Sequence, residues 1–496
     1  ANTIWAGTDD GLVWITRDAG KNWKDVTPPS LAAWSKITQI SASHFDDQTA
    51  YVSVSRFRVD DMRPYIFRTH DGGKTWQPIT EGLPIKAAAN TVREDPVRKG
   101  LLFAGTENAV WVSFDDGDHW QALQLNLPHT SMRDLWVHEN DLIVATHGRS
   151  FWILDDIAPL RQMADASANA SAEHLFSPSP AYRVRRDTNT DTPLPADEPA
   201  GENPADGAAL DYVLTQASTQ PVTLEILDMQ GKLVRRYSSD DKPELTQADL
   251  DKQLIPLYWL RAPKTLSAES GMHRWIWDLR YPPPVSSEHE YPIAAVPHDT
   301  PRYPLGSLVM PGQYTVRLTA NGHTYTASVT VKMDPRVKTS LSGLQKQFDL
   351  EMRLASAVSE SSEAVSHARS IHEQLGKLAM RGQLQAAAKS LDERVSALLD
   401  KPKDKDKDAA ETLSLTDGNS TVIALYKEVE KADAEPTSAQ VEAYNKTESE
   451  LVSAMKRWDE LKREIKSLNL QLTAAHEPEL RFDLPPEQSY EGVDEE

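Results

Sequence analysis

The chain has 496 residues, too many for one compact core, so we expect about two to four domains. Its 53 Lys and Arg residues against 74 Asp and Glu residues give a formal net charge of −21, which disfavours binding to nucleic acid. The absence of cysteine excludes disulfides, thiolate catalysis and cysteine-based zinc sites. No stretch approaches the roughly 18 to 20 continuous apolar residues of a membrane-spanning helix, so we expect no membrane span.

The first third of the chain repeats one octet three times, Ser/Thr-x-Asp-x-Gly-x-x-Trp. The aspartates of the three octets lie 53 and 44 residues apart, a spacing typical of propeller blades. The Asp can accept backbone N–H bonds across a turn, the Gly can adopt a conformation that other residues resist, and the Trp can pack beneath. We therefore interpret the octets as structural hairpins, and the residues assigned to them are Asp18, Gly20, Trp23, Asp71, Gly73, Trp76, Asp115, Gly117 and Trp120.

Each octet lies between the third and fourth strands of a predicted four-stranded unit. In the third unit we expect strands over 90–94, 101–105, 109–114 and 119–125. The first unit begins with a segment that matches the second strand of the later units, and the last unit has neither an octet nor a fourth strand. We predict a partial β-propeller of about four blades, incomplete at both ends and completed by an upstream propeller half or a complementary chain. A closed ring of four blades is the alternative.

The octets resemble the Asp-box, or BNR repeat, of sialidases, xyloglucanase-type hydrolases and sortilin-like receptor domains. The segments 56–76 and 127–156 are similar to the last blades of large bacterial BNR-repeat proteins, which are often labelled glycosyl hydrolases or sortilin-like proteins. This resemblance implies that the chain is the C-terminal part of such a protein, with sandwich and helical regions after the propeller. It also implies an extracellular or periplasmic location, since Asp-box proteins are mostly exported.

Composition changes twice after the propeller region. An Ala- and Ser-rich segment indicates a linker, and alternating strands then indicate a β-sandwich of immunoglobulin or fibronectin type. From 350 to 378, apolar or small residues recur at alternating spacings of four and three, which predicts a long amphipathic helix. Two further apolar stripes favour an antiparallel bundle, with a dimerising coiled coil as the alternative. The expected domains are propeller blades over 1–160, a linker over 161–174, a β-sandwich over 175–335, a helical bundle over 336–478 and a disordered acidic tail over 479–496.

The loops opposite the octets are the candidate binding face of this mainly β, multidomain chain. In a propeller, the loops joining second to third strands and those joining successive blades open on one face. Carboxylates, guanidinium groups, imidazoles and an indole meet there, which predicts a binding site; the alternative is that these groups only pair with one another. The candidate ligand-binding residues are Trp34, Arg56, Arg58, Asp61, Arg63, Glu107, His129, Arg133, His147 and Arg149.

Catalysis is the second hypothesis for this face. Glycosidases need two carboxylates at a defined separation, and Asp10, Asp61 and Glu107 are the candidates. A sialidase-type Tyr and Glu pair cannot be assigned, and no metalloprotease, phosphate-loop or dinucleotide motif is present. We predict a scaffold, without cofactor or metal, that binds a peptide, protein or glycan. The alternatives are a sialidase-like or endo-glucanase-like glycoside hydrolase whose site is shared with upstream blades, and a structural subunit of a larger assembly.

Overall fold

The computed structural model divides the chain into two compact units. The first contains Ala1–Ser179, Ala209–Gln216 and Ser270–Arg274, and the second contains Pro180–Ala208, Ala217–Glu269 and Trp275–Glu496. The structure describes residues 2–482 except for 167–172, 186–194, 196, 199–200, 202, 244, 253–254, 261–263, 287–288, 292–295, 297, 379–382 and 401–412.

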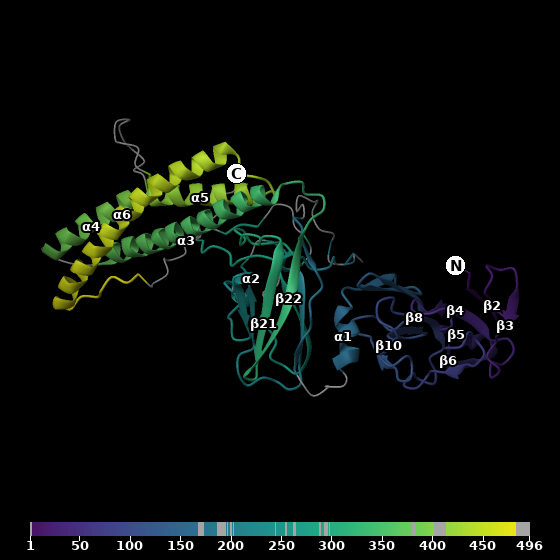
Figure 1. The fold of residues 1–496 in the computed structure, drawn as a ribbon. Helices are drawn as coiled ribbons and strands as arrows, with labels where there is room; N and C mark the ends of the chain where they lie inside the picture. Colours follow the sequence, from purple (N-terminus) through teal and green to yellow (C-terminus); the bar gives the residue numbers. More distant parts are fainter. Residues whose placement is uncertain are drawn as a thin grey trace. The chain divides into compact units, whose positions relative to one another are not determined.

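Four antiparallel sheets follow one another along the first unit, and each is a meander in chain order (Figure 1). The first two sheets are β1(Ile4–Gly7)-β2(Val13–Thr16)-β3(Trp23–Asp25) and β4(Lys36–Ala42)-β5(Ala50–Arg56)-β6(Asp61–Thr69)-β7(Gln77–Pro78). The next two are β8(Ala89–Glu94)-β9(Leu102–Thr106)-β10(Val110–Ser113)-β11(Gln121–Ala122) and β12(Met132–His138)-β13(Asp141–Thr146)-β14(Phe151–Leu154). The first and last sheets therefore have three strands each.

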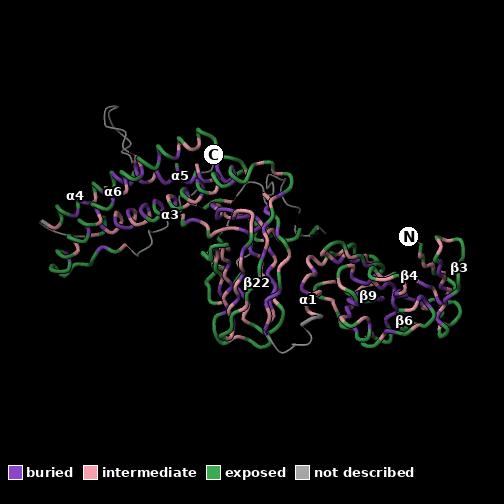
Figure 2. Tube along the Cα trace, viewed as in Figure 1, coloured by how far each residue is buried: buried purple, intermediate pink, exposed green. Residues whose placement is uncertain are grey.

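Apolar clusters fill the space between neighbouring sheets. One cluster joins the first sheet to the second, another the second to the third, and another the third to the fourth. All residues of β9 are buried because its sheet is covered on both faces, and this burial is visible as purple in Figure 2. Such stacking of small meanders is the arrangement of consecutive propeller blades, so the prediction of a partial propeller agrees with the topology.

Each octet closes its own hairpin. In the second octet, Asp71 Oδ1 accepts hydrogen bonds from the backbone N–H groups of Lys74 and Thr75, both at 2.9 Å. Thr69 Oγ1 accepts from Gly73 N at 3.0 Å, and Gly73 adopts a φ of 81°, which disfavours any residue with a Cβ. Because such bonds hold the octets in turns, β7 and β11 begin only after their octets, and β11 is shorter than the strand predicted over 119–125.

The octet tryptophans also join one sheet to the next, a role that the sequence did not indicate. Trp76 Nε1 donates to Val26 O at 2.6 Å, and Trp120 Nε1 donates to Ile79 O at 2.9 Å. In the first octet, Trp23 Nε1 donates to Gly20 O of its own turn, and the Trp23 residue is 42% exposed. The octet is thus both a local turn and a contact with the preceding blade.

A short helix and most of a further sheet belong to the first unit. Helix α1(Ala158–Ala166) begins after β14, so the segment expected to be a linker starts inside a helix. The further sheet has the order β15(His174–Leu175)-β17(Ala208–Leu214)-β20(Gly271–Trp277). Arg274 of β20 donates to Asp211 Oδ1 at 2.9 Å and to the carbonyl oxygens of Asp155 and Asp156. These bonds fix the sheet to the end of the fourth blade.

The second unit combines a five-stranded sheet with a helical bundle. The sheet order is β16(Ala181–Arg183)-β22(His323–Met333)-β21(Gly312–Ala320)-β18(Thr223–Leu227)-β19(Leu233–Ser238). Alternate residues of β21 are buried, as expected for a strand with one covered face. The short elements α2(Gln247–Leu250) and η3(Leu257–Trp259) also belong to this unit. Whether these strands form an immunoglobulin-like or fibronectin-like domain stays a prediction.

The bundle contains α3(Leu341–Lys377), α4(Gln383–Leu399), α5(Leu415–Glu430) and α6(Ser438–Ala474) (Figure 1). The helical region is confirmed, and the side chains of Ser340 and Thr437 cap α3 and α6. The predicted seam of α3 is buried against the other helices of the same chain. Leu480, in the segment expected to be a tail, is buried in this core, while 401–412 and 483–496 lie outside the described residues. None of the described helices is both long and apolar enough to cross a membrane.

Six buried or half-buried charges lie where the strands of the second unit meet its helices. Arg183 Nη2 lies 2.5 Å from Asp433 Oδ1, and Arg185 Nε lies 2.8 Å from the same oxygen. Arg185 and Arg280 both pair with Glu430. Glu351 has the longest pairing, 3.7 Å from Arg185 Nη2. Three arginines thus balance three carboxylates.

The octet bonds predict a pH-dependent contribution to stability. Hydrogen bonds from Thr75 hold the pKa of Asp71 at about 2, below its usual 3.8. Because the folded-state pKa is depressed, the contribution is present above about pH 4 and is lost as the pH falls toward 2. Asp71→Asn should lower the free energy of unfolding by about 1 kcal/mol at pH 7, since the turn is solvated. Urea titrations from pH 2 to 7 measure this difference, and Asp9→Asn, an exposed aspartate outside the octets, should show no loss.

The charge cluster predicts the opposite pH trend at one glutamate. Burial raises the pKa of Glu351 to about 7 from its usual 4.5. Because the folded state holds the proton more tightly, stability from this group falls as the pH rises from about 4.5 through 7. Glu351→Gln should abolish this loss of stability. The difference in free energy of unfolding between pH 8 and pH 5 should therefore be more favourable than in the unmodified protein by about 1 to 3 kcal/mol. Thermal or urea unfolding at both values is the measurement, with exposed Glu442→Gln as control; a parallel pH trend in Glu351→Gln would contradict it.

Candidate ligand-binding face

Residues of the third and fourth blades, two on inner strands and two on loops, meet around Arg133. Arg133 Nη1 lies 3.3 Å from Glu107 Oε1, and that oxygen also accepts from Asn90 Nδ2 at 3.1 Å. Arg133 Nη2 lies 3.5 Å from His147 Nδ1. Arg133 is on β12, Glu107 follows β9 and His147 follows β13, so antiparallel topology places all three at the end of the sheets opposite the octets. We call Asn90, Glu107, Arg133 and His147 the Arg133 cluster.

The Arg133 cluster leaves a guanidinium group available to solvent. The Arg133 side chain is 42% exposed, whereas the Glu107 side chain that orients it is 23% exposed. His129 lies beside the cluster, with Nδ1 3.3 Å from Asn108 O. Arg149 is exposed on a turn that Gly148 forms with a φ of 83°. The exposed side chains here are mainly cationic, in contrast to the acidic chain as a whole.

The other candidates form a separate group between the first and second blades. Asp61 accepts hydrogen bonds from Arg63 Nε at 2.9 Å, from Arg56 Nε at 3.2 Å and from Tyr65 OH at 2.8 Å. The Arg63 hydrogen bond is the largest cause that holds the pKa of Asp61 well below its usual range. Arg58 lies over its neighbour, the Phe57 ring. This geometry matches the alternative in which the charges of 56–63 pair with one another.

Trp34 and Asp10 lie at the edge of this second group. Trp34 is largely exposed and has a φ of 63°, and its backbone N donates to Asp10 O at 3.2 Å. The Asp10 carboxylate accepts a hydrogen bond from the Thr8 hydroxyl. Of the three candidate catalytic carboxylates, Asp10 and Asp61 thus lie with the first two blades, while Glu107 lies in the Arg133 cluster.

Two polar networks that join different blades are not predicted by the sequence pattern. On the inner strands, Gln39 Nε2 donates to Asp134 Oδ1 at 2.9 Å, and Arg93 Nη2 lies 3.2 Å from the same oxygen. Near the octets, Tyr51 OH donates to Asp116 Oδ1 at 2.5 Å, and Arg68 Nη1 lies 3.0 Å from Asp116 Oδ2. These pairs join different blades, so neither a local motif nor a periodicity could have indicated them.

A Tyr and Glu pair is also present, but it is buried. Tyr51 OH lies 3.4 Å from Glu94 Oε1, and both residues are buried. Burial is the largest cause that raises the pKa of Tyr51. A sialidase-type nucleophile must reach its substrate, so this pair does not supply that chemistry. In the part of the chain that the structure describes, no group of three or more His, Asp or Glu residues is arranged to hold a metal ion.

Comparisons with known proteins find likeness only among solved structures. No protein-family model matches the chain, and no curated protein matches it. It is similar to a YCF48 protein bound to a D1 peptide, with 19% identity over 31% of this chain and 48% of that chain, at a TM-score of 0.26. It is also similar to a GH74 xyloglucanase from Xanthomonas campestris, with 17% identity over 32% of this chain and 26% of that chain, at a TM-score of 0.26. A computationally designed protein, Ika8, shows 9% identity over 67% of this chain and 87% of that chain, at a TM-score of 0.23.

These similarities cover only part of the known structures. The chain spans about half the length of the first of these structures and about a quarter of the second. TM-scores of 0.26 or less carry no argument about fold or function. The blade assignment therefore depends on the strand order and the clusters between sheets.

Proposed function

We propose that the first unit is a binding scaffold and that the Arg133 cluster anchors a carboxylate of a peptide or protein ligand. The main observation in support is the half-exposed guanidinium group of Arg133, which Glu107 and Asn90 hold in one orientation. A fixed guanidinium matches the planar geometry of a carboxylate and forms charge-assisted hydrogen bonds with it.

The surrounding loops favour an anionic ligand over a neutral one. The exposed cationic or titratable side chains on these loops are Lys86, His129, Arg133, His147 and Arg149. Glu107, the carboxylate of the Arg133 cluster, is already paired with Arg133. A local cationic site on a chain of net charge −21 gives electrostatic selectivity for an acidic peptide segment at that position.

Hydrolysis is less well supported by this geometry. A glycosidase needs one carboxyl group that holds a proton and a second carboxylate across the substrate. Arg63, Arg56 and Tyr65 stabilise the ionised form of Asp61, so this residue is a poor general acid. Arg133 likewise occupies Glu107. A structural role in a larger assembly remains compatible with the binding proposal, because a bound protein segment would be part of that assembly.

The octets also support three wider proposals. Their hydrogen bonds agree with Asp-box, or BNR, hairpins, so we infer that the chain is of the sortilin-like BNR class of bacterial proteins. We further infer that the strands of 175–335 form an immunoglobulin-like or fibronectin-like sandwich. An extracellular or periplasmic location follows from that class alone, and fractionation of the cells that express the protein tests it.

A fluorescein-labelled hexaglutamate peptide is the probe for the Arg133 cluster. We expect saturable binding at low salt, since the site is cationic, and weakening by about tenfold or more in Arg133→Gln because charge-assisted hydrogen bonds are lost. Fluorescence anisotropy measures both dissociation constants. Hexalysine should not bind.

The matched control is Arg236→Gln, which removes an arginine of similar exposure, 44%, in the second unit. It should bind hexaglutamate like the unmodified protein. Equal affinity of Arg133→Gln and Arg236→Gln would contradict the proposal. Preference for hexagalacturonate over hexaglutamate would instead favour the glycan ligand, and release of reducing sugar from a glycan panel would favour the hydrolase.

A further inference from the structure

The same apolar pocket recurs between neighbouring blades, and a tryptophan fills it twice. Alignment of the first three blades on their octets, and of the fourth blade on its third strand, places four residues at matching positions in each pocket, with Leu31 offset by one residue. Trp76 shares a core cluster with the first set, and Trp120 shares one with the second. The first set is Val13, Val26, Leu31 and Phe67, and the second is Ile66, Ile79, Leu83 and Trp111.

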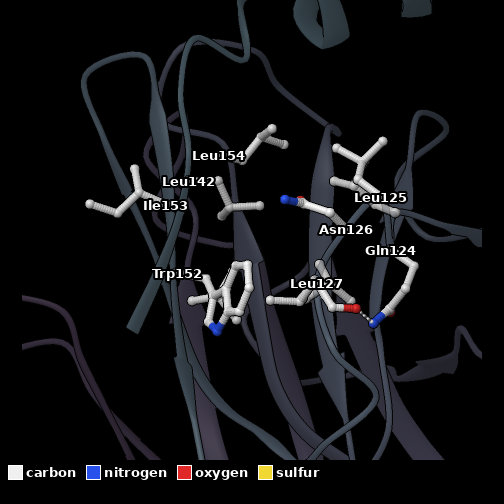
Figure 3. A pocket seen from close by; sticks show the side chains of 11 residues that line it. Gln124, Leu125, Asn126, Leu127, Leu142, Trp152, Ile153 and Leu154 are labelled. Atoms are coloured by element: carbon white, nitrogen blue, oxygen red, sulfur yellow. Dashed lines mark hydrogen bonds between the residues drawn. The ribbon is translucent and has the colours of Figure 1, made fainter. Parts of the chain in front are cut away.

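The third copy of this pocket is not filled by an octet tryptophan. Its matching residues are Val110, Leu123, Leu127 and Trp152, and they line a groove that is open to solvent. Figure 3 shows Leu125 and Leu127 on one side of the groove and Trp152 and Leu154 on the other. The fourth blade has no octet, so it supplies no indole here. We call this space the Leu127 groove.

The strand beside the Leu127 groove has a free edge. Among the described residues, β14 pairs only with β13, and none of its residues is buried, whereas at least three residues are buried in each of β2, β6 and β10. Phe151 and Ile153 are 76% and 57% exposed. A free edge with exposed apolar side chains is the backbone template to which an extended strand can add.

The filled repeats show which backbone bonds such a strand would make. Ile79 N donates to Ile66 O at 2.9 Å, and Leu123 N donates to Val110 O at 2.9 Å. The equivalent acceptor on β14 is the carbonyl oxygen of Phe151. The indole acceptors in the filled repeats are Val26 O and Ile79 O, and their equivalent is Leu123 O.

One buried polar atom in the Leu127 groove also lacks a partner. Gln124 Nε2 donates to Leu127 O at 2.5 Å, but Gln124 Oε1 is buried and accepts no hydrogen bond from the residues that the structure describes. A buried unpartnered acceptor is costly, so a donor from an incoming segment would stabilise it.

We propose that the free edge of β14 receives a fourth strand from another polypeptide segment, which carries a tryptophan into the Leu127 groove. The pattern of that segment is Trp-x-x-apolar, as in Trp23 with Val26, Trp76 with Ile79 and Trp120 with Leu123. The indole N–H donates to Leu123 O, and the apolar residue covers Phe151. This site is distinct from the Arg133 cluster and takes a different ligand.

The probe is a synthetic peptide of residues 117–125, the chain's own fourth-strand segment, added to the full chain. We expect saturable binding below 1 mM, new hydrogen-exchange protection of the β14 amides, and weakening of about tenfold or more when alanine replaces the tryptophan of the peptide. Leu125 is 71% exposed on the groove rim, so Leu125→Arg should leave the protein folded. It should weaken binding of the unmodified peptide about as much as the alanine substitution in the peptide does.

Ile85→Arg is the matched control, because Ile85 is also 71% exposed but does not line the groove. It should bind the peptide normally, and Leu125→Arg should bind hexaglutamate normally. Three results would each overturn the proposal: no binding at 1 mM, equal binding of the alanine-substituted peptide, or hydrogen-exchange protection that appears elsewhere but not at β14. None of them would contradict the acidic-ligand proposal.

Discussion

The first unit depends on one contact, the bond from an octet indole to a carbonyl oxygen of the preceding sheet. Trp76 reaches Val26 O and Trp120 reaches Ile79 O, while the aspartate of each octet closes its own turn. An eight-residue motif therefore fixes a hairpin and also the distance to the next sheet. Because the indole is amphipathic, it fills an apolar pocket and satisfies a buried carbonyl at once.

The two candidate ligand positions differ in physical character. The Arg133 cluster is cationic and solvated, and its geometry is held by Glu107 and Asn90. The Leu127 groove is apolar and lies beside an unpaired backbone edge. The first selects by charge, and the second by strand geometry and side-chain volume. A scaffold can use both together, since contacts at the two places share no residue.

Local signals predicted the repeat well. The pattern predicts inner strands of the third sheet over 90–94, 101–105 and 109–114, and β8, β9 and β10 lie within one residue of these limits at every end. The octet turn and the helical seam were also legible, because each depends on residues close in sequence. The short fourth strands were not, since the bonds of Asp115 extend the turn as far as His119.

The sequence suggests candidate residues but not how they group in space. All ten candidate residues were named, but their division into two groups follows from which blades their loops join. The Arg133 contact to Glu107 spans 26 residues, and the Tyr51 contact to Asp116 spans 65. Such pairs depend on the stacking of sheets, which no local pattern encodes. The pairing within 56–63 was foreseeable because Asp61 and Arg63 are two residues apart.

The balanced charges of the second unit couple its strands to its helical region. Arg183 and Arg185 belong to a strand and its following residues, whereas Glu430 and Asp433 belong to the helical region. Replacement of Glu430 and Asp433 by neutral residues would leave Arg183 and Arg185 buried without these counter-ions, at a cost of several kcal/mol. The strand arginines and the helical-region carboxylates therefore constrain one another, and a change on one side is tolerated only with a matching change on the other.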